Sequence, residues 1–165
     1  MENLWAPWRM EYILDQSQDQ GCIFCPGDVT SFDRERLILH VGPRTLVLMN
    51  KYPYNNGHLL IAPKRHLPEP RHLSPEETAE LWDAVNKSLD CLQELMNPDG
   101  FNVGLNLGQA AGAGLTEHLH VHLVPRWVGD TNFMTVLGEV RSVPEHLKRT
   151  FDRLRPLIAR TFGED

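Results

Sequence analysis

The stretch from Glu117 to Trp127, E-H-L-H-V-H-L-V-P-R-W, constrains this chain more than any other. Alternate residues of a β-strand point to the same face, so the pattern predicts a strand with His118, His120 and His122 on one face and apolar side chains on the other. The chain has eight histidines in 165 residues. A triple at this spacing is then expected by chance only about 0.02 times. We therefore expect the three imidazoles to have a chemical use.

Strand geometry limits what the three histidines can do together. Neighbouring members lie about 6.6–7 Å apart and the outer two about 13 Å apart, so one metal ion could bind two of them but hardly three. A central reactive imidazole, His120, with a helper on each side fits this spacing better. A neutral imidazole is a good nucleophile when an acceptor, such as a main-chain carbonyl, holds the proton on its other nitrogen. The acid in the motif, Glu117, falls on the opposite face, which favours a nucleophile over a general base.

The motif H-L-H-V-H-L-V-P-R-W resembles that of the histidine-triad (HIT) family of nucleotide hydrolases and transferases. Its P-R-W ending is similar to the branch that contains the fragile-histidine-triad proteins and the bacterial diadenosine tetraphosphate phosphorylases. Other similar stretches are L-W-A-P-W-R-M-E-Y-I at 4–13, C-I-F-C at 22–25, M-N-K-Y-P-Y-N-N-G-H-L-L-I-A-P at 49–63 and G-F-N-V-G-L-N-L-G at 100–108. The likeness covers nearly the whole chain.

This resemblance implies covalent catalysis at the α-phosphorus of an adenosine nucleotide. His120 is expected to attack and form a nucleotidyl-histidine, which inorganic phosphate or water then cleaves. The expected catalytic residues are His120, His122, His58 and His118. The residues expected to bind the nucleotide are Asn50, Asn106, Gly114, Leu115, Thr116 and His122.

Without the resemblance, several of these residues have ordinary structural explanations. Asn50 and His58 flank a turn, where a capping Asn and a solvated His are common. The loop at 108–116 is rich enough in glycine for main-chain N–H groups to approach an anion, but such loops are often only flexible hairpins. The resemblance favours a ribose contact for Asn50, an active-site imidazole for His58 and a phosphate contact for Asn106.

Cys22 and Cys25 form a C-x-x-C pair whose role the spacing alone leaves open. Metal binding, redox chemistry and a buried structural pair all remain, since a structural zinc needs four ligands. In some members of the HIT family, a histidine after the P-K stretch and the first histidine of the triad complete the site. The resemblance therefore implies a structural zinc bound by Cys22, Cys25, His66 and His118. Magnesium can also accompany a polyphosphate substrate.

Composition and length narrow the class of protein. A chain of 165 residues with 41% hydrophobic content can form one globular domain with its own core. A net charge of −6 argues against binding long nucleic acid by neutralising phosphates. The apolar runs are too short to span a membrane. Three cysteines make no paired disulfide framework and the N-terminus resembles no signal peptide, so we expect a cytoplasmic protein.

Patterning predicts an α+β fold with a mostly antiparallel five-stranded sheet, one long helix and a C-terminal helix. Strands are expected at 36–41, 45–50, 58–62, 101–107 and 117–127. Ser74 begins the long helix through a capping box, with Trp82 and Met96 in the core. Ser142 is expected to begin the last helix, which Pro156 should kink or end.

We expect one domain in three parts. Residues 1–35 form an aromatic N-terminal segment and a C-x-x-C knuckle, 36–127 form the core with the catalytic strand, and 128–165 form a C-terminal loop and helix. The resemblance also implies a homodimer that joins two sheets.

The acceptor is the least constrained part of the expected chemistry. Likeness to the bacterial phosphorylases favours inorganic phosphate, which would yield ADP and ATP from diadenosine tetraphosphate. The candidates for a phosphate pocket are the glycine-rich loop, Arg126 and Lys64. The alternatives are a hydrolase of dinucleoside polyphosphates or nucleoside phosphoramidates, a zinc-dependent hydrolase with His120 and His122 as ligands, and a nucleotide-binding scaffold with vestigial activity.

Overall fold

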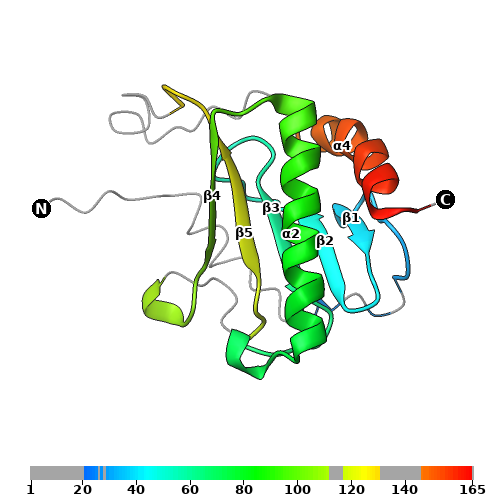
Figure 1. Cartoon of the computed structure of the whole chain (residues 1–165), viewed down its shortest axis with the longest axis vertical. Helices are drawn as coiled ribbons and strands as arrows, with labels where there is room; N and C mark the ends of the chain where they lie inside the picture. The colour runs from blue at the N-terminus through cyan, green and yellow to red at the C-terminus, as the bar shows by residue number, and fades with distance from the viewer. Residues whose placement is uncertain (1–20, 26, 28, 112–116, 131–145, 165) are drawn as a thin grey trace, which may run out of the picture.

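The computed structural model of the chain describes residues 21–25, 27, 29–111, 117–130 and 146–164. Five antiparallel strands form one sheet in the order β1-β2-β3-β5-β4 (Figure 1). The strands are β1 (Ile38–Val41), β2 (Thr45–Met49), β3 (Leu59–Pro63), β4 (Gly100–Leu105) and β5 (Val121–Arg126). The helices are α2 (Pro75–Met96), α4 (Leu147–Phe162) and the short 3-10 turns η1 (Pro70–His72) and η2 (Gln109–Ala111). The α+β class and the five-stranded sheet are confirmed.

The sheet has two apolar faces, and the histidines lie on the face away from the helices. Helices α2 and α4 pack on one face, where their side chains share a cluster with Val121 and Leu123 of β5. The opposite face carries a second cluster, which we call the knuckle-side cluster: Phe24, Ile38, Leu46, Leu48, Leu60 and Ala62. His122 lies between Val121 and Leu123 and is paired with Leu60. Because neighbouring residues of a strand alternate in direction, His122 points to the knuckle side.

The turn before β3 positions His58 and depends on a glycine. Gly57 has φ +77°, a conformation that L side chains rarely adopt, and a Cβ there would lie 2.8 Å from Met96 Sδ. The main chain then closes through a hydrogen bond from Asn50 N–H to the His58 carbonyl, at 2.9 Å. Residue 58 is therefore fixed at the mouth of the β2–β3 hairpin.

The long helix begins as predicted, but one of its expected core residues is exposed. Ser74 accepts a hydrogen bond from Glu77 N–H, and the Glu77 side chain returns one to Ser74 N–H, which completes the capping box. Trp82 is 47% exposed, so its assignment to the core is wrong. Leu81 and Val85 face the sheet. Position 82 is turned by about 100° from position 81 in a helix with 3.6 residues per turn.

The last helix continues past its proline. Helix α4 starts at Leu147 with His146 as its N-cap and runs through Pro156 to Phe162. Of the two outcomes predicted for Pro156, an end of the helix is therefore wrong, and a kink stays a prediction. The carbonyl that the proline leaves without a helical donor belongs to Asp152, an exposed residue, so water can satisfy it. The expected start at Ser142 lies outside the described residues, and so does the aromatic segment at 4–14.

The strand that carries the histidine triad is shorter than predicted. β5 begins at Val121, opposite Leu105 at the end of β4, so His118 and His120 precede the ladder. Leu119 N–H donates instead to the Leu67 carbonyl, at 2.6 Å, which ties this segment to the loop after β3. Within the described residues, no helix is long and apolar enough to cross a membrane.

Candidate active site and metal centre

His120 is held in the tautomer that a nucleophile needs. Its Nδ1 lies 2.8 Å from the main-chain oxygen of His118, so Nδ1 carries the proton and donates it. The lone pair is then on Nε2. The side chain is only 8% exposed. Burial lowers the pKa of His120 below the usual histidine value, with the carbonyl acting in the opposite direction. The net lowering of the pKa favours a neutral imidazole, and the hydrogen bond at Nδ1 leaves the lone pair on Nε2.

A chain of hydrogen bonds sets the tautomers of His58 and His122. Tyr54 N–H donates to His58 Nδ1 at 3.0 Å, so the proton of a neutral His58 is on Nε2. His58 Nε2 lies 3.0 Å from His122 Nδ1 and donates to it, which leaves the proton of His122 on Nε2. His58 is 1% exposed, so it is a buried relay and not a solvated histidine. The relay ends in an N–H donor at His122 Nε2.

Asn106 adds a second donor beside this one. It directly follows β4, and its Nδ2 lies 3.4 Å from His122 Nε2. Two N–H donors so placed can share one acceptor, such as a phosphate oxygen. The structure thus brings Asn106 to the triad, whereas Gly114, Leu115 and Thr116 lie outside the described residues.

Asn50 has the turn role that its sequence position suggests. Its Oδ1 accepts from Tyr52 N–H at 2.9 Å, and its Nδ2 lies 3.3 Å from His58 Nδ1. It therefore braces His58 directly. Its contact with a ribose stays a prediction.

Two cations expected near the phosphate are engaged elsewhere. The Arg126 guanidinium pairs with Asp130 through Nε and NH2 and donates to Asn102 through NH1. It lies six residues along the chain from His120, about 20 Å in an extended strand. Lys64 Nζ donates to the Gly42 carbonyl at 3.2 Å. Both residues contact the scaffold, and a role for either in a phosphate pocket stays a prediction.

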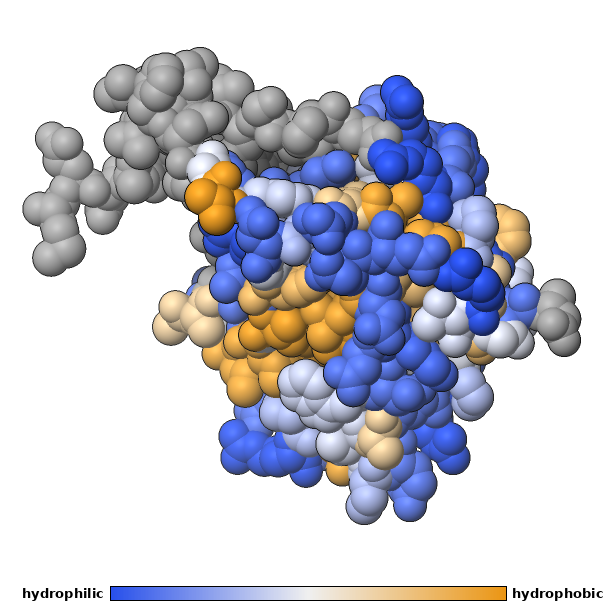
Figure 2. Space-filling model, turned by 45° about the horizontal axis from the view of Figure 1, so that its top comes forward, coloured by the Kyte–Doolittle hydropathy of each residue, from blue (hydrophilic) through white to orange (hydrophobic). Residues whose placement is uncertain are grey.

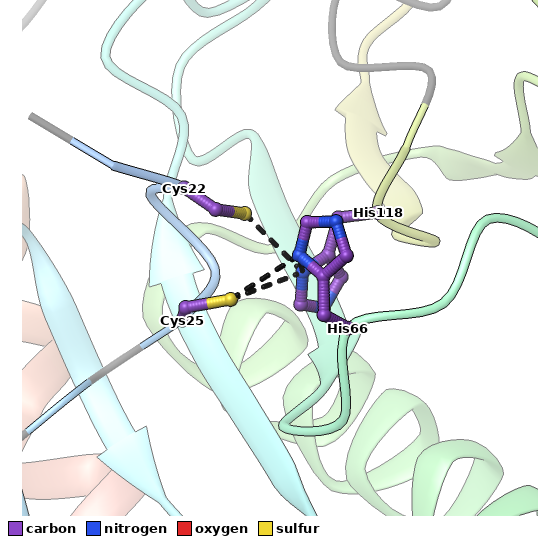
Figure 3. A group of neighbouring side chains, drawn as sticks. All are labelled: Cys22, Cys25, His66 and His118. Atoms are coloured by element: carbon purple, nitrogen blue, oxygen red, sulfur yellow. Dashed lines mark hydrogen bonds between the residues drawn. The ribbon is translucent and has the colours of Figure 1, made fainter.

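Cys22, Cys25, His66 and His118 converge on one point (Figure 3). Their ligand atoms all lie within 4.8 Å of one another. Four pairs lie closer: Cys22 Sγ to His118 Nδ1 at 3.2 Å, Cys25 Sγ to His66 Nδ1 at 3.3 Å and to His118 Nδ1 at 3.7 Å, and His118 Nδ1 to His66 Nδ1 at 3.2 Å. The edges of a tetrahedron around zinc, with bonds of about 2.0 Å to nitrogen and about 2.3 Å to sulfur, measure about 3.3–3.8 Å. The four residues fit such an ion.

His118 is prepared for a metal by its other nitrogen. Its Nε2 donates to the Pro63 carbonyl at 2.7 Å, which leaves the Nδ1 lone pair facing the cysteines. The side chain of His118 therefore belongs to the candidate metal centre, and its carbonyl orients the ring of His120. Among the described residues, His120 and His122 join no cluster of three or more metal-ligating groups. This placement argues against a zinc ion bound by these two histidines.

Two aromatic residues at the site had no predicted role there. Phe24, between the two cysteines, stacks on His120, and Tyr54 stacks on His122 with ring centroids 5.7 Å apart. A usable signal was present for Phe24. Because His118 was expected to be both a metal ligand and a triad member, a residue between two ligand cysteines had to lie near the triad.

Burial of neutral histidines should make the fold sensitive to acid. Burial, and secondarily the charge of His120, lowers the pKa of His122 to about 4. In the unfolded chain, His122 has its usual pKa of about 6.5. As the pH falls, the unfolded state therefore binds the proton before the folded state does. We expect the free energy of unfolding to decrease between about pH 6.5 and about pH 4. Urea titrations across this range should show a smaller decrease for His122→Asn, and an equal decrease in both proteins would contradict this assignment.

Comparison with known proteins agrees with this geometry. The HIT domain family model matches residues 34–128. The AP-4-A phosphorylase of Mycobacterium tuberculosis is 39% identical over 157 residues, which cover 91% of this chain and 80% of that protein. The bis(5'-adenosyl)-triphosphatase of Dictyostelium discoideum is 29% identical, over 76% of this chain and 87% of that protein.

A solved structure gives the same result. The crystal structure of a Zn-bound histidine triad family protein from Mycobacterium smegmatis superposes with a TM-score of 0.66 at 25% identity, over 88% of this chain and 98% of that one. The family match spans more than half of the chain and includes the triad. This chain belongs to the HIT domain family.

Proposed function

We propose that the protein cleaves diadenosine tetraphosphate through a covalent adenylyl-His120 and passes the adenylyl group to inorganic phosphate. The observation that carries the proposal is the tautomer of His120, whose Nδ1–H is held by the His118 carbonyl so that Nε2 is free to attack. The similarity to a protein named AP-4-A phosphorylase supports the substrate and the acceptor.

In the first step, His120 Nε2 attacks the α-phosphorus of the substrate. A nitrogen–phosphorus bond forms, the bond from that phosphorus to the bridging oxygen breaks, and ATP leaves with the bond's electron pair. The Nδ1–H bond to the His118 carbonyl persists and stabilises the positive charge that develops on the ring. The donors at His122 Nε2 and Asn106 Nδ2 stabilise the negative charge on the phosphoryl or bridging oxygens.

In the second step, an oxygen of inorganic phosphate attacks the adenylyl phosphorus. The nitrogen–phosphorus bond breaks, ADP forms, and the electron pair returns to His120 Nε2, which regenerates the neutral ring. Water in the same position would yield AMP. Magnesium, where present, accompanies the polyphosphate through phosphate oxygens. With Arg126 and Lys64 engaged elsewhere, we assign the acceptor phosphate to the main-chain N–H groups of the loop at 108–116.

We propose that the metal at the Cys/His cluster is structural zinc. The mixed donor set of two sulfurs and two nitrogens suits zinc, and it leaves no open position for a substrate. Such an ion would tie the Cys22–Cys25 loop to the segment that precedes β5. Thiol ligands must stay reduced, which accords with our proposal of a cytoplasmic location.

We also propose a homodimer that joins two sheets at β4. This strand is at the edge of the sheet, next to β5 only. An open edge offers unpaired main-chain groups to a second copy. Val103 in this strand and Leu107 just after it are exposed large hydrophobic residues. Figure 2 shows an apolar area in orange within the polar surface of the face that carries α2, as expected where a partner binds.

The acceptor can be identified from the products. Enzyme, diadenosine tetraphosphate and labelled phosphate should give ATP and ADP, with the label in the β-position of ADP. Wild-type turnover should depend on added phosphate. AMP and ATP as products at every phosphate concentration would instead establish a hydrolase, the activity that the similarity to a triphosphatase favours. Tight binding without cleavage would establish a nucleotide-binding scaffold.

Metal analysis tests the zinc proposal. Purified, unchelated protein should contain about one zinc per chain. Cys25→Ala should lose the zinc and lower the free energy of unfolding by more than about 3 kcal/mol, because metal binding contributes directly to folding. Cys91→Ala is the matched control. Cys91 is buried in the cluster between the helices and the sheet, away from the four candidate ligands, so this variant should keep its zinc. Protein that is folded and free of metal would contradict the proposal.

Sedimentation equilibrium tests the dimer. We expect a mass of two chains for the wild type and a shift toward one chain for Val103→Lys, which places a charge at the proposed junction. Trp82→Lys is a control on the exposed side of α2. A wild-type mass of one chain at micromolar concentration would contradict this proposal.

A further inference from the structure

We propose that Phe24 is a positioning residue for the nucleophile. Its ring, carried by the loop between the two candidate metal ligands Cys22 and Cys25, holds the imidazole of His120 in its reactive orientation. This inference rests on the proposed role of His120 as nucleophile.

The ring of Phe24 touches both histidines that matter at this junction. Its centroid lies 4.6 Å from that of His120 with the planes 25° apart, a stacked arrangement. It lies 5.3 Å from that of His118 at 52°. Phe24 is completely buried. Distances of this size are those of favourable aromatic pairs, so the ring is in direct contact with the nucleophile.

Phe24 supplies a constraint on His120 that no other described contact supplies. The His118 carbonyl fixes one atom of the imidazole, Nδ1. His122 meets the ring edge-on, with centroids 4.9 Å apart and planes at 61°. A flat contact on the face prevents the ring from rocking about the axis of its hydrogen bond. With all three contacts, the Nε2 lone pair has one direction.

The position of Phe24 is fixed from both sides. Cys25 N–H donates to the Cys22 carbonyl at 3.0 Å, which closes a tight turn around Ile23 and Phe24. The thiols at both ends of this turn meet the same ring, at His118 Nδ1. The Phe24 side chain also packs into the knuckle-side cluster. Because the turn is anchored in this way, it keeps the Phe24 ring in a fixed position against His120.

Replacement of the Phe24 ring should lower kcat and leave KM nearly unchanged. In Phe24→Leu the site stays apolar but loses the flat contact. We expect kcat with diadenosine tetraphosphate and phosphate to fall about 10- to 100-fold, because small misplacements of reacting groups have effects of this size. KM should stay within about threefold and zinc content should stay unchanged. Phe24→Met, which keeps more of the volume, is the second variant if Phe24→Leu does not fold.

Ile38→Val is the matched control. Ile38 belongs to the same knuckle-side cluster and is completely buried, but it lies on β1, at the far edge of the sheet from β5. This variant removes apolar volume from the cluster without touching His120. Its kcat should stay within about twofold of the wild type. An equal fall in kcat for the two variants would reduce Phe24 to a packing residue and overturn the proposal.

Nitrogen NMR of the histidine rings measures the tautomer of His120 directly and requires no catalytic activity. In the wild type, His120 should show a proton on Nδ1 alone, whereas in Phe24→Leu it should show exchange between the two tautomers. Unchanged His120 signals in the variant would overturn the proposal, as would an unchanged kcat. If the wild type cleaves no dinucleotide, the proposed function fails, and the NMR comparison still decides whether Phe24 positions His120.

Discussion

The hydrogen bond from His120 Nδ1 to the His118 carbonyl, 2.8 Å long, is the interaction on which the site depends. It joins two residues only two positions apart, so it requires the chain to keep one local conformation before β5. That conformation is imposed from outside the segment. Leu119 N–H is bound by Leu67, the His118 ring is bound by Pro63, and the cysteine loop packs over both histidines. The candidate metal centre, the loop after β3 and His120 are therefore one connected structure.

Burial on the knuckle side of the sheet explains why a cluster of histidines can remain neutral. Desolvation lowers the pKa values of His118, His120 and His122 in the same direction. Hydrogen bonds then decide which ring nitrogen of each neutral histidine carries the proton. Tyr54 N–H sets the tautomer of His58, and His58 sets that of His122. The segment before β5 thus supplies a lone pair at His120, and β5 supplies a donor at the neighbouring ring of His122. Helices α2 and α4 stabilise the opposite face, and Met96 of α2 packs against the Gly57 turn that precedes His58.

The sequence predicted what local pattern determines and missed what tertiary contacts determine. The capping box at Ser74, the sheet, and the convergence of Cys22, Cys25, His66 and His118 follow from spacing and from likeness to the HIT family. The strand limits did not follow, because the partner of Leu119 is a loop carbonyl and not a strand. Nor did the engagement of Arg126, since Asp130 and Asn102 come together only in the folded chain. Trp82 was misplaced because a hydrophobic residue next to a buried face need not belong to it.

The most direct test of the account is to trap the covalent intermediate. Wild-type protein mixed with diadenosine tetraphosphate in the absence of phosphate, quenched and mapped by peptide mass spectrometry, should carry an adenylyl group on His120. His120→Gly should carry none, yet should bind the nucleotide within about tenfold of the wild type, or roughly 1.4 kcal/mol, because a nucleophile acts mainly in the transition state. An adenylyl group on another residue, or wild-type rates of cleavage by His120→Gly, would contradict the account.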